Sequence, residues 1–181
     1  MSGSDSKKIA EHSGHGVAAK IAAYQIIVVY DPKTSQGTFY LMGASGKDSK
    51  TVLQANVVVG GQDHVTPTGD FHASFWETDH VSKQYGWKAD TAWSKSVMGL
   101  NAFGPYQLHI RELEKRGIYI HGTMGPSWSH TTAISGIAVS QSSHGCVRMS
   151  NADVLALHNL IPEPQGIPIK ITTKPDDAPK K

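Results

Sequence analysis

The stretch SSHGCVRMSNADVLALHNLI, residues Ser142 to Ile161, contains Cys146, which is the only cysteine of the chain. A lone cysteine cannot form an internal disulfide, so it is packing filler, a metal ligand or a nucleophile. Its neighbours are small or polar, which argues against filler. His144 and Cys146 are metal-ligand types, but no paired ligand spacing accompanies them, so we expect no metal. A nucleophilic thiol is therefore the interpretation to test.

The second half of this stretch has the clearest helix pattern of the chain. Ser150 is a suitable N-cap, and Asp153 suits the first turn of a helix. The apolar residues that follow share one helical face, namely Val154, Leu157 and Ile161. We expect the helix to end before Pro162. Its N-terminal partial charge and the Arg148 cation would favour a thiolate at Cys146, while Gly145 allows a tight turn with exposed N–H groups.

A thiol nucleophile needs a base, and the chain has 10 histidines. His121 in IYIHGT follows an apolar strand pattern and precedes a glycine, so it can project into a cleft. His109, His130 and His144 are the alternatives. Cys146 follows His121 by 25 positions, and the long Gly- and Ser-rich loop between them keeps His130 open as an alternate base.

The rest of the chain has mostly strand patterns. A mixture of β-branched and aromatic residues, bounded by Gly, Pro and Asp, is typical of short strands joined by turns. We predict strands within residues 22–30, 38–43, 51–61, 66–76, 106–110, 117–123 and 166–172. The sequence therefore predicts a mostly β fold with one clear helix after Cys146.

Length and composition fit one soluble globular domain. The chain has 181 residues, of which 39% are hydrophobic and 18% charged, and its formal charge is +2. We expect a flexible lead-in at residues 1–18, one domain at 19–173 and a flexible tail at 174–181. The weak charge does not predict a nucleic-acid partner, and the apolar runs are too short to span a membrane. The N-terminal residues lack the apolar core of a signal peptide, which leaves open a trimmed leader.

Three motifs in this order, TPTGDF, IHGT and SHGCVRMSNADV, resemble the L,D-transpeptidase catalytic domain of the YkuD type. The resemblance covers residues 21–172 and implies a β-sandwich-like fold without a cofactor. It implies that Cys146 is the nucleophile, His121 its base, and the Gly122 carbonyl the group that orients the imidazole. Backbone N–H groups near His144 and Gly145 would hold the oxyanion.

The resemblance also implies substrates and a location. The thiolate would attack a tetrapeptide stem of peptidoglycan and release its terminal D-alanine. The acyl group would pass to another stem in a 3→3 cross-link, to a lipoprotein lysine, to a D-amino acid or to water. We expect a location in the cell envelope. The expected substrate-binding residues are Arg148, Ser143, Thr123 and Tyr106.

Other functions remain open at this point. An L,D-carboxypeptidase would use the same acyl-enzyme and water as the acceptor. A sortase-like transpeptidase also uses histidine, cysteine and arginine on a β scaffold, although its sequence context differs. A non-catalytic wall-binding module would share the fold. The presence of both Cys146 and His121 favours an enzyme.

Overall fold

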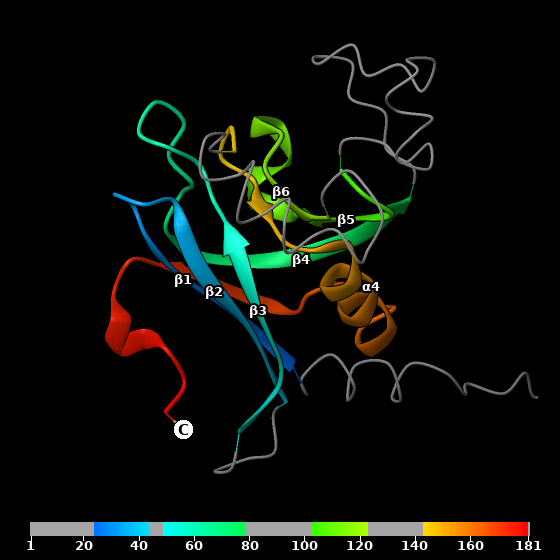
Figure 1. Cartoon of the computed structure of the whole chain (residues 1–181). Helices are drawn as coiled ribbons and strands as arrows, with labels where there is room; N and C mark the ends of the chain where they lie inside the picture. The colour runs from blue at the N-terminus through cyan, green and yellow to red at the C-terminus, as the bar shows by residue number, and fades with distance from the viewer. Residues whose placement is uncertain (1–23, 44–48, 79–102, 123–142, 181) are drawn as a thin grey trace, which may run out of the picture.

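The computed structural model describes residues 24–43, 49–78, 103–122 and 143–180, and Figure 1 shows their arrangement. These residues form a β-barrel with one α-helix. The strands are β1 (Tyr24–Asp31), β2 (Gln36–Gly43), β3 (Lys50–Val58), β4 (Gly69–Thr78), β5 (Tyr106–Ile110), β6 (Tyr119–His121), β7 (Val147–Arg148) and β8 (Pro168–Thr172). The helices are α4 (Asn151–Leu160) and two 3-10 helices, η1 (Arg111–Arg116) and η4 (Pro175–Asp177).

Strand pairing closes the sheet in the order β1-β2-β3-β7-β6-β5-β4-β8, with β8 parallel to β1. The mostly β fold with one α-helix after Cys146 is thus confirmed within the described residues, and the sheets of the expected sandwich join into one barrel. Closure joins the sheet into a ring, although β3 pairs with the two-residue β7 only through Val58 and Arg148. The short strands β6 and β7 carry the IHGT and SHGC motifs side by side.

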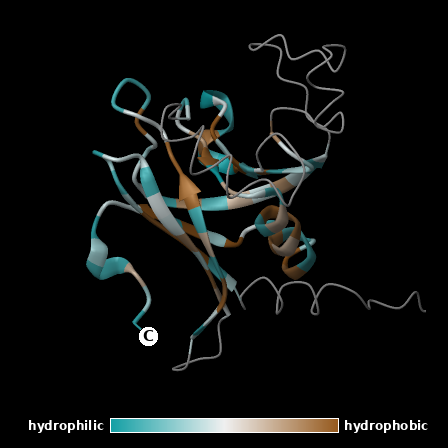
Figure 2. Ribbon diagram, viewed as in Figure 1, coloured by the Kyte–Doolittle hydropathy of each residue, from teal (hydrophilic) through white to brown (hydrophobic). Residues whose placement is uncertain are grey.

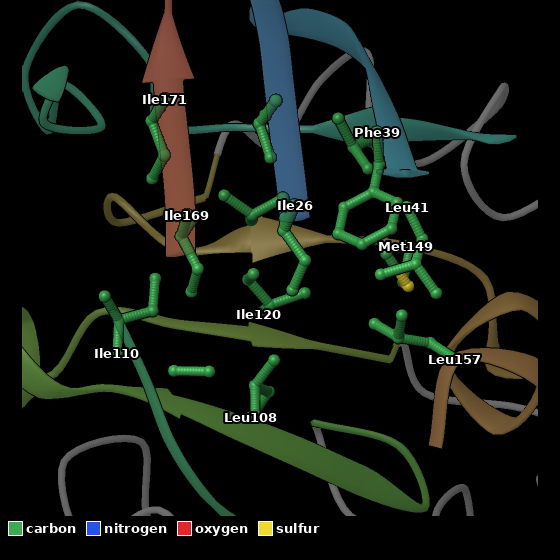
Figure 3. Close-up of a cluster of buried hydrophobic side chains, with 14 of the residues drawn as sticks. Ile26, Phe39, Leu41, Leu108, Ile110, Ile120, Met149, Leu157, Ile169 and Ile171 are labelled. Atoms are coloured by element: carbon green, nitrogen blue, oxygen red, sulfur yellow. The ribbon is translucent and has the colours of Figure 1, made fainter. Parts of the chain in front are cut away.

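The barrel interior is a continuous apolar core to which every long strand contributes alternate residues. Figure 3 shows side chains from opposite walls of the barrel pointing toward one another, among them Ile26, Phe39, Leu108, Ile120 and Ile169. All five are at most 1% exposed. Their burial supplies the main stabilising term and makes the barrel wall a rigid support for any site on its outer face.

Helix α4 begins and ends where the sequence indicates. Ser150 has extended backbone angles, and its hydroxyl accepts the Asp153 backbone N–H at 2.8 Å. The predicted apolar face is buried, with Val154 and Leu157 fully inaccessible. Both hydrophobic and hydrophilic residues run along this helix in Figure 2. The indole of Trp76 donates to the Ile161 carbonyl at 2.9 Å and ties the helix end to β4.

The predicted domain limits and termini are only partly covered by the described residues. The predicted lead-in at 1–18 lies outside the described residues. Within the predicted tail, Asp177 of η4 accepts hydrogen bonds from Lys170 and Thr172, at 2.9 and 2.7 Å. The domain limits stay predictions. Among the described helices, none is long and apolar enough to cross a membrane.

Candidate active site

The two motif strands place their polar residues on one face. β6 and β7 are parallel, with Ile120 beside Val147 and His121 beside Arg148. Ile120 and Val147 are buried in the core, so strand alternation directs His121 and Arg148 to the outer face of the barrel. The Tyr119 backbone hydrogen-bonds the Cys146 thiol, which places the sulfur beside the same pair of strands. The register of two short strands therefore brings the predicted nucleophile and base to one face.

A tight turn before β7 holds the cysteine. The Ser143 N–H donates to the Val59 carbonyl at 3.2 Å, and the Ser143 hydroxyl donates to the Cys146 carbonyl at 2.7 Å. Gly145 has a φ of +106°, and a Cβ atom there would lie 3.2 Å from the Ile118 side chain. Only glycine adopts this backbone without strain, so the glycine of SHGC is required by the turn itself.

Thr66 of the TPTGDF motif fastens this turn to the barrel. Its fully buried hydroxyl accepts the Gly60 N–H at 2.8 Å and donates to the Gly145 carbonyl at 2.9 Å. Its own carbonyl accepts the Tyr30 hydroxyl at 2.6 Å. This role of Thr66 could not be predicted from the sequence, because a threonine 80 residues before the cysteine carries no local signal of such a contact.

We expect Thr66→Val to lower the free energy of unfolding by about 2 to 4 kcal/mol, because it leaves a buried N–H and a buried carbonyl without partners. It should also slow reactions of Cys146, because the turn loses its anchor. Urea denaturation followed by thiol-reactivity measurements checks both effects. Thr66→Ser keeps the hydroxyl and is the matched control. Equal stability of the valine and serine variants would contradict this role.

His121 is held in one tautomer by its neighbour. Its Nδ1 atom lies 2.5 Å from the Gly122 carbonyl oxygen, so Nδ1 carries the proton and donates it. The other ring nitrogen, Nε2, then keeps its lone pair in the neutral imidazole and can accept a proton. The ring is buried, 5% exposed, and the edge of Phe103 packs on it with centroids 4.8 Å apart. The Met149 N–H donates to the His121 carbonyl at 2.9 Å, which fixes the strand as well.

The resting state of Cys146 differs from what the sequence suggested. The residue is 8% exposed, and burial raises the pKa of its thiol to about 11, although the Tyr119 backbone hydrogen bond and the Arg148 charge lower it. The thiol also donates to the Gly117 carbonyl at 3.5 Å. Strand β7 lies between Cys146 and the start of α4 in the chain. Burial outweighs the cation, and the resting group is a neutral thiol.

This protonation state predicts a pH profile for alkylation. The iodoacetamide reaction rate of the folded protein should rise about tenfold per pH unit from pH 7 to 10, because only the thiolate reacts. The rate should level off near the thiol pKa of about 11. The urea-unfolded chain, with an ordinary thiol pKa of about 8.5, should level off earlier and serves as the control. A plateau of the folded protein below pH 8 would contradict a neutral resting thiol.

The remaining predicted site residues lie in different surroundings. His144 is exposed and its ring packs against His64, with centroids 4.4 Å apart. Tyr106 is half-buried and stacks on His158 at 3.9 Å, so its ring packs against the helix side of the barrel. Thr123 and His130 lie outside the described residues. The catalytic and binding roles of all these residues stay predictions.

Comparison with known proteins agrees with the geometry. Comparison with curated proteins found no significant sequence match. Solved structures share the fold: Bd1075 of Bdellovibrio bacteriovorus has a TM-score of 0.52 and 17% identity over 83% of this chain and 48% of that one. A cysteine-to-serine mutant of an Enterococcus faecium L,D-transpeptidase has a TM-score of 0.52 and 16% identity over 82% of this chain and 49% of that one.

This chain therefore spans about half the length of these structural relatives. The sequence also matches the family described as L,D-transpeptidase catalytic domain, YkuD, over residues 23–171, which is most of its length. The matched segment contains all three motifs and all eight strands of the barrel, apart from the last residue of β8. The chain thus belongs to the L,D-transpeptidase catalytic domain family.

Proposed function

We propose that the chain is a cysteine-dependent L,D-transpeptidase that acts on peptidoglycan tetrapeptide stems through an acyl-enzyme. The observation that carries this proposal is the shared outer face of β6 and β7. There the Cys146 turn lies beside His121, whose tautomer leaves Nε2 free of a proton. Nucleophile, base and orienting carbonyl are the parts that acyl transfer requires.

The reaction begins with proton transfer from the Cys146 thiol to His121 Nε2. The sulfur attacks the carbonyl carbon before the terminal D-alanine, and the carbonyl π electrons move to the oxygen. Collapse of this oxyanion breaks the C–N bond, and the imidazolium gives its proton to the leaving D-alanine amine. A thioester remains on Cys146. An acceptor amine then attacks the thioester, and the sulfur leaves and is reprotonated.

The neutral resting thiol fits this order of events. With a thiol pKa of about 11, the attacking thiolate forms only as the proton passes to His121. Arg148 would stabilise it, since the Arg148 charge acts against the rise in pKa. Backbone N–H groups of the turn at His144 and Gly145 would hold the oxyanion. Arg148, Ser143, Thr123 and Tyr106 are the proposed contacts to the stem, with His130 as the alternate base.

Membership of the family favours the cell envelope as the location and peptidoglycan as the partner. The acceptor decides the biological outcome. Another stem gives a 3→3 cross-link, a lipoprotein lysine gives anchoring, a D-amino acid gives exchange, and water gives L,D-carboxypeptidase activity. All four share the acyl-enzyme, so the proposal applies to the common first half of the reaction.

Incubation with purified disaccharide tetrapeptides, followed by mass analysis of the products, tests the proposed function. We expect release of D-alanine together with a cross-linked dimer, an exchanged stem or a tripeptide, each of which identifies its acceptor. Addition of a free D-amino acid should divert the product toward exchange. Tetrapeptides recovered unchanged would contradict the enzyme and favour a wall-binding module.

A further inference from the structure

A second polar cluster lies on the outer face beside the proposed catalytic residues. His109 Nε2 is 2.8 Å from a carboxylate oxygen of Glu77, and the Gln107 amide nitrogen is 3.5 Å from the same oxygen. Gln107 is 1% exposed and His109 8% exposed, whereas the Glu77 side chain is 35% exposed. The reaction proposed above uses none of these three residues.

A β-bulge puts Glu77 into this cluster. In the pairing of β4 with β5, Ala73 faces Ile110 and Trp76 faces Leu108, so two residues of β4 lie opposite one residue of β5. Ala73 and Trp76 both pack on the core, so the bulge reverses the alternation between them. Without it, Glu77 would point into the apolar core. With it, Glu77 pairs with Gln107 on the polar face.

Two buried acceptor atoms in this cluster have no hydrogen-bond partner in the described part of the chain. Since His109 Nε2 donates to Glu77, the neutral imidazole keeps its lone pair on Nδ1. This Nδ1 atom and the Gln107 carbonyl oxygen are both buried and make no hydrogen bond among the described residues. Leaving such atoms unpaired costs about 1 to 3 kcal/mol each, a cost that is more typical of functional clusters than of purely structural ones.

The cluster lies across one strand from the cysteine. Gln107 pairs with His121 and His109 with Tyr119, so β5 is adjacent to β6, and β6 is adjacent to β7. At about 4.8 Å between strands, the backbone of His109 is about 10 Å from that of the Cys146 strand. An acyl group bound at Cys146, with an extended side chain, spans this separation along the outer face.

The chemistry of the cluster favours a cation. It offers the partly exposed carboxylate of Glu77, which the His109 ring and the Gln107 amide hold in place. The ring of Phe75, 41% exposed, stacks on His109 with centroids 4.0 Å apart and can cover an alkyl chain or an ammonium. A primary ammonium is a positively charged N–H donor, which matches this carboxylate.

We propose that Glu77, Gln107 and His109 form a subsite that binds the side-chain ammonium of the diamino acid in the donor stem. This inference rests on the proposed function, because it assigns one part of the same substrate. It makes Glu77 a specificity residue for the third position of the stem. Lysine and diaminopimelate both end in an ammonium, so both are tested as donors.

The test compares donor tetrapeptides that carry lysine, diaminopimelate or norleucine at the third position, since norleucine keeps the alkyl chain without the ammonium. D-alanine release gives kcat/KM for each donor. Wild type should prefer the ammonium donors by about 10- to 100-fold, the range for a hydrogen bond to a charged group. Glu77→Gln should bring this preference close to one while leaving norleucine turnover unchanged.

Glu112→Gln is the matched control. Glu112 pairs with His72 at the same 2.8 Å distance, but on an exposed part of the surface, so its loss should leave the preference intact. Acylation by a carbapenem, which carries no diamino acid, should proceed at the wild-type rate in Glu77→Gln.

Equal wild-type turnover of all three donors would overturn the subsite and leave the proposed function standing. A Glu77→Gln variant that loses carbapenem acylation and all donors alike would show a structural role instead. Wild type that releases D-alanine from no donor would overturn the proposed function, and this inference with it.

Discussion

Cys146→Ala is expected to abolish the covalent adduct that the wild-type protein forms with a carbapenem. The β-lactam carbonyl presents the sulfur with a strained amide, and the resulting thioester adds the full mass of the drug to the protein. Cys146 is the only cysteine of the chain, so no other thiol can substitute. Intact-mass spectrometry before and after incubation measures the effect.

The variant should fold as the wild type does, because alanine fits the turn and removes only the sulfur, with its 3.5 Å hydrogen bond to the Gly117 carbonyl and its hydrogen bond from the Tyr119 backbone. Thermal unfolding is the control for this. An adduct that persists in the alanine variant would place the nucleophile elsewhere. A wild-type protein that stays unmodified, with its thiol still titratable after unfolding, would contradict the acyl-enzyme.

His121→Ala should lower the acylation rate by about two to four powers of ten, which is the usual loss when a general base is removed. The effect should be large here because the resting thiol has a pKa of about 11 and depends on a base for its proton. Stopped-flow or timed-quench measurement of carbapenem adduct formation gives the rate. The deficit should shrink as the pH approaches 11, where hydroxide supplies the thiolate.

His130→Ala is the comparison for this prediction and should react within a few fold of the wild-type rate. The reverse result, a slow His130 variant and a normal His121 variant, would move the base to His130. His121→Asn keeps a donor for the Gly122 carbonyl and removes the basic nitrogen, so it should be as slow as alanine.

Local sequence patterns predicted the elements that depend on local interactions. Helix α4 has its N-cap at Ser150 and its apolar face at Val154 and Leu157, as the spacing indicated. Strand β5 has the predicted bounds, and β8 buries its alternating isoleucines. These signals are strong because capping and periodicity involve residues within one or two turns of each other.

Features that depend on distant contacts were not predictable in this way. Strand β7 has two residues, too few for any period, and exists because Val58 and Ile120 flank it from other parts of the chain. The role of Thr66 depends on Gly60 and Gly145, and the position of Glu77 depends on a bulge that its own sequence does not mark.

The protonation state of the Cys146 thiol also could not be predicted from the sequence. From sequence, a nearby arginine and a following helix favoured the thiolate. The structure adds the burial of Cys146, which raises the thiol pKa more than Arg148 lowers it. Burial is a property of the whole fold, so the motif alone could not supply its magnitude.

The most direct test of the central claim is acid quench of the protein with a tetrapeptide donor in the first turnover, followed by peptide mapping. We predict a tripeptide thioester on Cys146, formed together with one equivalent of D-alanine and absent from Cys146→Ala. Release of D-alanine with no acyl group on the protein, or an acyl group on any other residue, would contradict this account.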